Sequence, residues 1–189
     1  MRQRPHLPLP PLVFITDRWR QPHPEVIVSA LPRGSAVLFR DYGLLNRKLL
    51  GKKLEALCRK KRLIFLVAGD GALAQNLSAN GIHLSEVHIR EVPFWRSKHP
   101  NWLITVAAHS EAALQKAARA GADAALVSPV FKTQSHPEAK ALGATRLRRL
   151  AASCPIPVYA LGGVNSRTQR LLKNIGLCGL AGISSFDRE

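Results

Sequence analysis

Short apolar segments recur along the chain at regular intervals, and few of them alternate between polar and apolar residues. Near-continuous apolar runs of this kind are typical of parallel strands that are buried on both faces. The pattern predicts eight strands, at 12–17, 36–41, 62–69, 81–85, 102–109, 124–131, 157–163 and 179–185.

Stretches with helical periodicity lie between the predicted strands. The clearest are 45–60, 110–120, 142–152 and 166–175. In the second of these, Ser110 can cap the N-terminus and Gly121 can end the helix. A short helix is expected between the first two strands, where prolines interrupt the chain, whereas 86–101 is weak as a helix.

Eight strands that alternate with helices predict a parallel sheet, and their number favours closure into a (β/α)8 TIM barrel. A doubly wound open sheet is the alternative. The chain has 189 residues, whereas TIM barrels usually have about 200 or more, and four residues follow the last predicted strand. We therefore expect an N-terminal tail at 1–11 and one compact α/β barrel domain at 12–189, with its last helix truncated or supplied by another chain.

The charge balance is strongly basic. The chain has 28 lysines and arginines against 12 acidic residues, a net charge of +16, which suits an anionic partner. The basic residues are scattered at helical spacing among apolar ones, as on the solvated faces of helices. Specific nucleic-acid binding is therefore only a distant alternative.

The cysteine spacing and the absence of long apolar runs limit the class of protein. Cys58, Cys154 and Cys178 form no Cys-x-x-Cys pair, which argues against a zinc site and a disulfide framework. No apolar run approaches the ~20 residues of a membrane span. The start of the chain is interrupted by prolines and does not have the pattern of a signal peptide. We expect a cytoplasmic protein that does not bind membranes.

Small residues follow the last two predicted strands. In TIM barrels the loops after strands 7 and 8 frequently form a phosphate site. Gly162 and Gly163 follow the seventh strand, and Ile183 and Ser184 lie at the end of the eighth. Exposed backbone N–H groups at such places can bind a phosphate, although a glycine pair is also typical of a tight turn without a ligand. The coincidence of the two signals favours a phosphate site.

The segment GADAALVSPVFKTQSHPEAKALGATRLRRLAASCPIPVYALGGVN resembles the second half of the thiamine-phosphate synthase/TenI family. The resemblance extends in register to LVFITD, ANGIHLS and GLAGISS, so it covers nearly the whole chain. It implies a TIM barrel that binds a phosphorylated thiazole. The residues at the family's thiazole-phosphate positions are Thr133, Ser135, Gly162, Gly163, Ile183 and Ser184.

The positions that match the family's pyrimidine-diphosphate half-site differ from those of the synthases. Arg40 is retained, whereas a magnesium-binding aspartate matches Gly69, with Asp70 as its neighbour. The other departures are Leu38, Tyr42, His88, Ala107 and Gln134. Magnesium prefers carboxylate oxygens, and a leaving pyrophosphate needs cations. No cofactor is therefore expected, and magnesium is needed only if the chain is a genuine synthase in which other groups, such as Asp70 or Glu86, replace the lost ligands.

The TenI branch implies a different reaction, the tautomerisation of a thiazole-carboxylate phosphate. This reaction needs a proton shuttle, for which histidine is suited near neutral pH. The matching residue is His109. The alternative interpretation of this histidine is a purely structural role. His136 is a second candidate, and His83 is expected to pack in the barrel or to bond a neighbour.

The resemblance leaves two functions of different class. The first is a thiazole tautomerase, and the second is a degenerate member of the family that binds a phosphorylated thiazole without turnover. Retention of His109 favours the enzyme, whereas the altered half-site favours the binder. We also expect a homodimer, because a truncated last helix leaves apolar barrel surface to be covered.

Overall fold

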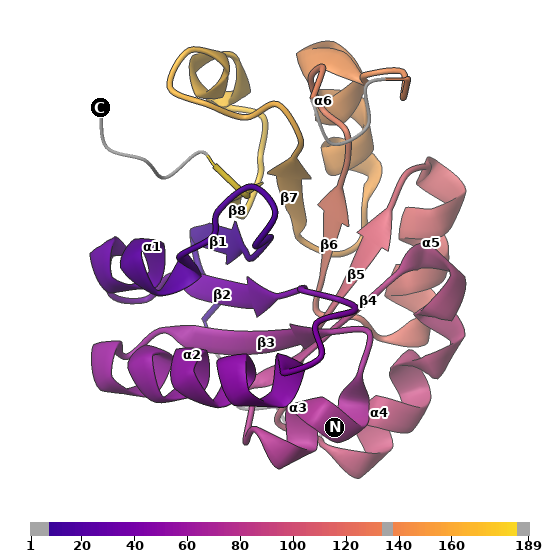
Figure 1. The fold of residues 1–189 in the computed structure, drawn as a ribbon. Coiled ribbons are helices and arrows are strands. Elements are labelled where there is room, and N and C mark those ends of the chain that lie inside the picture. The colour runs from indigo at the N-terminus through magenta and orange to yellow at the C-terminus, as the bar shows by residue number, and fades with distance from the viewer. Residues whose placement is uncertain (1–7, 134–137, 185–189) are drawn as a thin grey trace.

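The computed structural model describes residues 8–133 and 138–184, and its eight parallel strands pair in sequence order around a closed barrel (Figure 1). The pairing of the first strand with both the second and the eighth excludes the open sheet. The predicted TIM barrel is therefore confirmed. The strands are β1 (Leu12–Ile15), β2 (Ala36–Phe39), β3 (Ile64–Ala68), β4 (Gly81–Leu84), β5 (Leu103–Ala108), β6 (Ala124–Val127), β7 (Val158–Leu161) and β8 (Gly179–Gly182).

Helices cover the outside of the barrel between successive strands. They are α1 (Pro24–Ala30), α2 (Arg47–Lys61), α3 (Gly71–Asn76), α4 (Val92–Lys98), α5 (Glu111–Ala120) and α6 (Gly143–Ser153), with two short 3₁₀ helices, η1 (Glu86–Glu91) and η2 (Thr168–Leu172). The caps predicted for α5 are present, because the Ser110 hydroxyl accepts the N–H of Ala113 and Gly121 has a φ of 87°. The weak segment 86–101 forms η1 and α4.

The helix predicted at 166–175 is wrong, since only the short η2 forms there. The side chain of Asn165 accepts the N–H groups of Arg167 and Thr168, and the Thr168 hydroxyl donates to the carbonyl of Gly163. These bonds tie the segment to the end of β7 as a tight turn. Asn174 then adopts a left-handed φ of 61°, which is incompatible with a continuing helix.

The interior of the barrel is filled by alternate strand residues, and Tyr159 forms much of its floor. Tyr159 is 1% exposed, and its hydroxyl donates to the carbonyl of Pro10 at 2.8 Å. Burial raises the pKa of this phenol above its usual value. Leu180 of β8 also donates its N–H to Pro11, so the end of the predicted tail packs against the barrel.

The chain after β8 continues through Ile183 and Ser184, and within the described ranges no helix follows it. Residues 185–189 lie outside those ranges. Among the helices that the structure describes, none is long and apolar enough to cross a membrane. The carboxyl ends of the eight strands meet at one mouth of the barrel, which is where a TIM barrel carries its functional residues.

Candidate functional site

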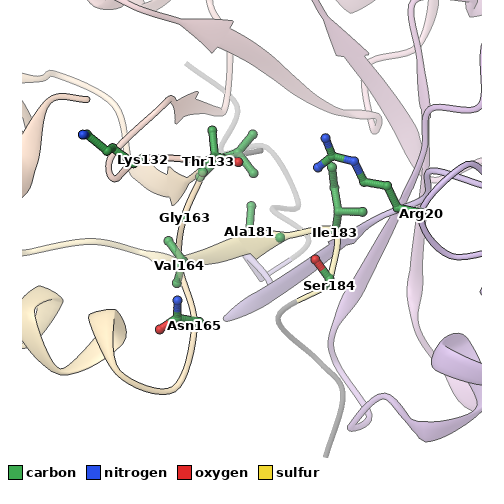
Figure 2. Close-up of a pocket in the computed structure, with 12 residues that line it drawn as sticks. Arg20, Lys132, Thr133, Gly163, Val164, Asn165, Ala181, Ile183 and Ser184 are labelled. Carbon is green, nitrogen blue, oxygen red and sulfur yellow. The ribbon is translucent and has the colours of Figure 1, made fainter. Parts of the chain in front are cut away.

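A cavity of about 280 Å³ lies at the carboxyl ends of β7 and β8 (Figure 2). The structure brings together five of the six residues predicted to bind phosphate. They are Thr133, Gly162, Gly163, Ile183 and Ser184. The sixth, Ser135, lies outside the described residues, as does His136. Arg20, Lys132 and Asn165 also line the cavity and were not predicted to do so.

The two glycines allow the loop after β6 to pack against the end of β7. Gly162 and Gly163 have left-handed φ values of 90° and 66°. A Cβ atom on Gly163 would lie 2.5 Å from the carbonyl oxygen of Lys132, and one on Gly162 would lie 3.0 Å from the Cα of Pro129. Any side chain at Gly163 would therefore displace the neighbouring backbone. The glycine pair serves the tight turn and also forms part of the cavity wall.

The cavity offers several hydrogen-bond donors to an anion. Within the residues that the structure describes, no hydrogen bond uses the backbone N–H of Gly163 or of Ser184. Thr133 and Ser184, which carry hydroxyl groups, also line the cavity. Arg20 reaches toward Ile183 from the loop after β1 (Figure 2). Backbone N–H groups, hydroxyls and one guanidinium together suit a phosphate monoester.

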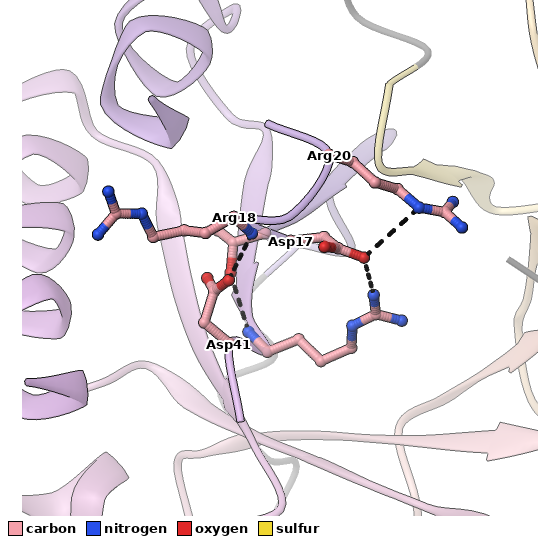
Figure 3. Close-up of polar contacts among 6 residues, drawn as sticks. Asp17, Arg18, Arg20 and Asp41 are labelled. Atoms are coloured by element: carbon pink, nitrogen blue, oxygen red, sulfur yellow. Dashed lines mark hydrogen bonds and ion pairs between the residues drawn. The ribbon is translucent and has the colours of Figure 1, made fainter. Parts of the chain in front are cut away.

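Arg20 is held by a carboxylate that the sequence analysis also missed. Asp17 lies 3.8 Å from Arg20 Nε and 2.7 Å from Arg40 Nη2, so it bridges the two arginines (Figure 3). Arg40, predicted as a pocket residue, thus lies at the barrel mouth as half of an ion pair. The available signal is the position of Asp17 at the end of the first predicted strand, where side chains reach the mouth of a barrel.

His109 follows β5 directly and is exposed at the mouth. Its Nδ1 lies 2.6 Å from the carbonyl oxygen of Ser128. Because a carbonyl only accepts hydrogen bonds, Nδ1 carries the proton and Nε2 keeps a lone pair. The backbone N–H of His109 donates to the Glu86 carboxylate at 2.8 Å. These two contacts fix the tautomer and the position of the imidazole at the barrel mouth.

The loop after β6 joins this histidine to the cavity. Ser128 accepts the bond from His109, and the next residue, Pro129, is the one that packs against Gly162. Thr133, farther along the same loop, lines the cavity. The predicted base and the predicted phosphate residues thus contact one continuous segment.

Asp70, a predicted pocket residue, is engaged within the protein. Its Oδ1 accepts the N–H of Leu73 at 2.8 Å and caps α3, and its Oδ2 lies 3.5 Å from Arg47 Nη1. The Arg47 guanidinium also donates to the Ala68 carbonyl and lies 5.2 Å from the centre of the Tyr42 ring. Arg47 and Tyr42 therefore occupy the space beside the end of β3.

The polar groups around the end of β3 and the loop after β4 are bonded to other parts of the protein. Glu86 accepts the N–H of His109, and His88 bonds the Ser85 hydroxyl through its Nδ1. The ring of Tyr42 lies over Gly69, where a Cβ would come within 3.3 Å of it. Magnesium takes an octahedral set of oxygens, usually with one or two carboxylates. Among the described residues no group of three or more His, Cys, Asp or Glu side chains could hold a metal ion.

His83 bonds a neighbour inside the barrel, as predicted. Its Nδ1 lies 2.9 Å from the Thr105 hydroxyl. Burial and, to a lesser extent, the nearby Arg40 charge lower the pKa of this imidazole to about 4. His83 is therefore neutral at pH 7 and supplies a polar wall without a charge.

The neutral state of His83 makes stability depend on pH. The pKa of His83 falls from 6.5 to about 4 on folding, so its stabilising contribution is complete above pH 6.5 and is lost as the pH falls toward 4. At 1.36 kcal/mol per pKa unit, the loss amounts to about 3 kcal/mol. Thermal melts between pH 7 and pH 4 should show a shallower decline for His83→Gln than for the wild type. Parallel declines would contradict the assignment.

Comparison with known proteins gives a consistent family. The family model described as thiamine monophosphate synthase matches residues 12–186. The chain is 35% identical over 183 residues to "Putative thiamine-phosphate synthase 2" of Aquifex aeolicus, covering 94% of this chain and 98% of that one. It is 31% identical to thiamine-phosphate synthase of Pyrococcus furiosus, covering 92% and 85% of the two chains. A solved thiamine phosphate pyrophosphorylase from Pyrococcus furiosus matches with a TM-score of 0.80 and 29% identity, over 94% of this chain and 87% of that one. The chain belongs to the thiamine monophosphate synthase family.

Proposed function

We propose that this chain binds a phosphorylated thiazole in the cavity at the ends of β7 and β8 and moves a proton on its ring, as a thiazole tautomerase with His109 as the general acid–base. The orientation of His109 carries the proposal. Its Nδ1–H is fixed on the Ser128 carbonyl, which leaves Nε2 to take a proton from one ring position and return it at another. No proton is consumed overall.

The fixed hydrogen bond suits both halves of such a transfer. When Nε2 takes the proton, the imidazole becomes a cation, and the bond from Nδ1–H to the Ser128 carbonyl strengthens. The phosphate, bound at a distance from the reacting ring, supplies binding energy that holds the ring near His109. Binding and proton transfer are therefore assigned to different residues.

The surroundings of Asp70 support a tautomerase over a synthase. A synthase must stabilise a leaving pyrophosphate, whereas here the Asp70 carboxylate is bonded to Leu73 and to Arg47. The test is to incubate the purified chain with a thiazole-carboxylate phosphate and to follow the conversion by NMR. A second reaction contains thiazole phosphate, pyrimidine diphosphate and magnesium. We expect turnover in the first and no thiamine phosphate in the second, and the reverse result would favour the synthase.

The filled space beside β3 also favours a second candidate, a family member that binds the phosphorylated thiazole without turnover. Arg47 and Tyr42 are held there by their own contacts, as expected of a half-site that has lost its ligand. This candidate predicts saturable binding of a thiazole phosphate by calorimetry together with no conversion of the carboxylate compound. The same two measurements therefore distinguish the candidates.

We also propose that the chain forms a homodimer. A hollow of about 610 Å³ lies beside η2 and β8, and its lining includes the partly exposed Leu177 and Leu180. A second copy seated on it would cover these side chains. Sedimentation at tens of micromolar should give a dimer, which Leu177→Glu weakens. A monomer at that concentration would contradict the proposal.

A further inference from the structure

A group of exposed apolar side chains lies at the rim of the barrel mouth, outside the cavity described above. Trp19, Tyr42, Leu45 and Leu49 are 94%, 58%, 103% and 55% exposed. They are half of the eight large apolar side chains that are exposed in the described residues. They come from the loop after β1, the loop after β2 and the first turn of α2, and we call them the rim patch.

Two adjoining hollows make the rim patch concave. One, of about 440 Å³, is lined by Trp19 and Tyr42, and the other, of about 480 Å³, is lined by Leu45 and Leu49. Leu44 and Arg18 line both hollows, so these form one continuous depression. A contiguous exposed apolar surface of this kind commonly marks an interaction site.

The side of the rim patch formed by the start of α2 is positively charged, whereas the arginines that line the first hollow are matched by two aspartates. Residues 42–53 contain Arg47, Lys48, Lys52 and Lys53 and no acidic residue. Lys53 lines the second hollow. The side chain of Asn46, at the start of the 15-residue helix α2, makes no capping hydrogen bond, and the first turn of the helix has no acidic side chain. The positive end of the helix dipole therefore lies beside the lysines, where a carboxylate is favoured.

Asp41 supplies a buried acceptor in the wall of the first hollow. It is 8% exposed, and its Oδ1 accepts the N–H of Arg18 at 2.7 Å (Figure 3). Its Oδ2 is buried and has no hydrogen-bond partner among the described residues. Buried polar atoms are almost always bonded, so this oxygen is suited to an N–H group from a molecule that enters the hollow.

We propose that the rim patch binds an acidic, amphipathic peptide segment of another protein. Its apolar side chains enter the two hollows, its carboxylates lie near Lys53 and the start of α2, and one of its N–H groups reaches Asp41. Charge complementarity selects this partner over a second copy, because a symmetric dimer through the same patch would bring the lysines of both copies together. The concave shape selects a peptide over a lipid surface, since inserted side chains fill hollows that a flat bilayer leaves empty.

The test uses a fluorescein-labelled 15-residue helical peptide with leucine on one face and glutamate elsewhere, read by fluorescence anisotropy in 0.15 M salt. Controls are the same peptide with lysine for glutamate and with serine for leucine. We expect saturable micromolar binding of the first peptide alone. Leu49→Ser and Lys53→Glu should each weaken it by about tenfold or more, which corresponds to about 1.4 kcal/mol. Trp19 fluorescence, taken as the difference from Trp19→Phe, should change on binding.

Matched variants give the specificity of the effect. Leu171 is 59% exposed on η2, so Leu171→Ser and Lys173→Glu repeat the same changes outside the rim patch and should leave the affinity unchanged. Equal losses at both places, or no binding at 200 µM peptide, would overturn the proposal. Two further results would overturn it if the peptide does not bind. One is binding of the protein to phosphatidylcholine–phosphatidylserine vesicles that Leu49→Ser abolishes. The other is a dimer in sedimentation that the same variant abolishes.

Discussion

Replacing His109 by alanine should lower the turnover of a thiazole-carboxylate phosphate by about 10²–10⁴-fold, the usual contribution of a general acid–base group. The affinity for the compound should change little, because the phosphate donors lie in the cavity at β7 and β8 and remain intact. Single-turnover NMR gives the rate, and calorimetry gives the dissociation constant. A loss in rate with unchanged binding would identify His109 as the group that transfers the proton.

His88 gives a matched control for this variant. It lies in η1, after β4, and is bonded to Ser85 rather than to the loop after β6. His88→Ala removes an imidazole from the same face of the barrel and should leave turnover near that of the wild type. If His109→Ala keeps its activity, another group moves the proton. His136, on the loop after β6, would then be the next residue to replace.

The sequence predicts the barrel well because its strands are buried on both faces. Burial on two faces demands near-continuous apolar runs, and these give all eight strands. The exception, 166–175, has the apolar spacing of a helix in Leu171, Leu172 and Ile175. There the hydrogen bonds of Asn165 and Thr168 to nearby backbone override the periodicity.

The wall of the cavity is predicted where small residues end a strand, whereas Arg20 and the ion pairs around it are not predicted. Small residues after β7 and β8 are readable because their positions in a TIM barrel have a known use. The ion pairs of Asp17 with Arg20 and Arg40 cannot be predicted in this way. Such pairs join different loops in space, and no regular spacing in the sequence indicates them. Arg47 is a further case. Its place in a lysine-rich helix predicts a solvated side chain, yet the side chain is 16% exposed and lies against Tyr42.

The second large effect concerns Arg20. Replacing Arg20 by glutamine should weaken the binding of a thiazole phosphate by about 10–100-fold, because a hydrogen bond from a charged group contributes about 1.5–3 kcal/mol. The structure places this guanidinium at the cavity, beside Ile183 (Figure 2). Calorimetry at two salt concentrations measures the loss, and the affinity of the variant should depend less on salt than that of the wild type.

Lys132→Gln is the control that separates this effect from the net charge of +16. Lys132 also lines the cavity, but its side chain points away from it (Figure 2), so its removal should change the affinity little. Equal losses in the two variants would mean that the anion is attracted by the overall charge and not bound by Arg20.

The variant Gly163→Asp cannot distinguish binding by Arg20 from attraction by the overall charge. Even a Cβ atom at Gly163 would lie 2.5 Å from the Lys132 carbonyl oxygen, so that variant alters the loop as well as the charge. Arg20→Gln changes the charge and leaves the contact between the two loops in place.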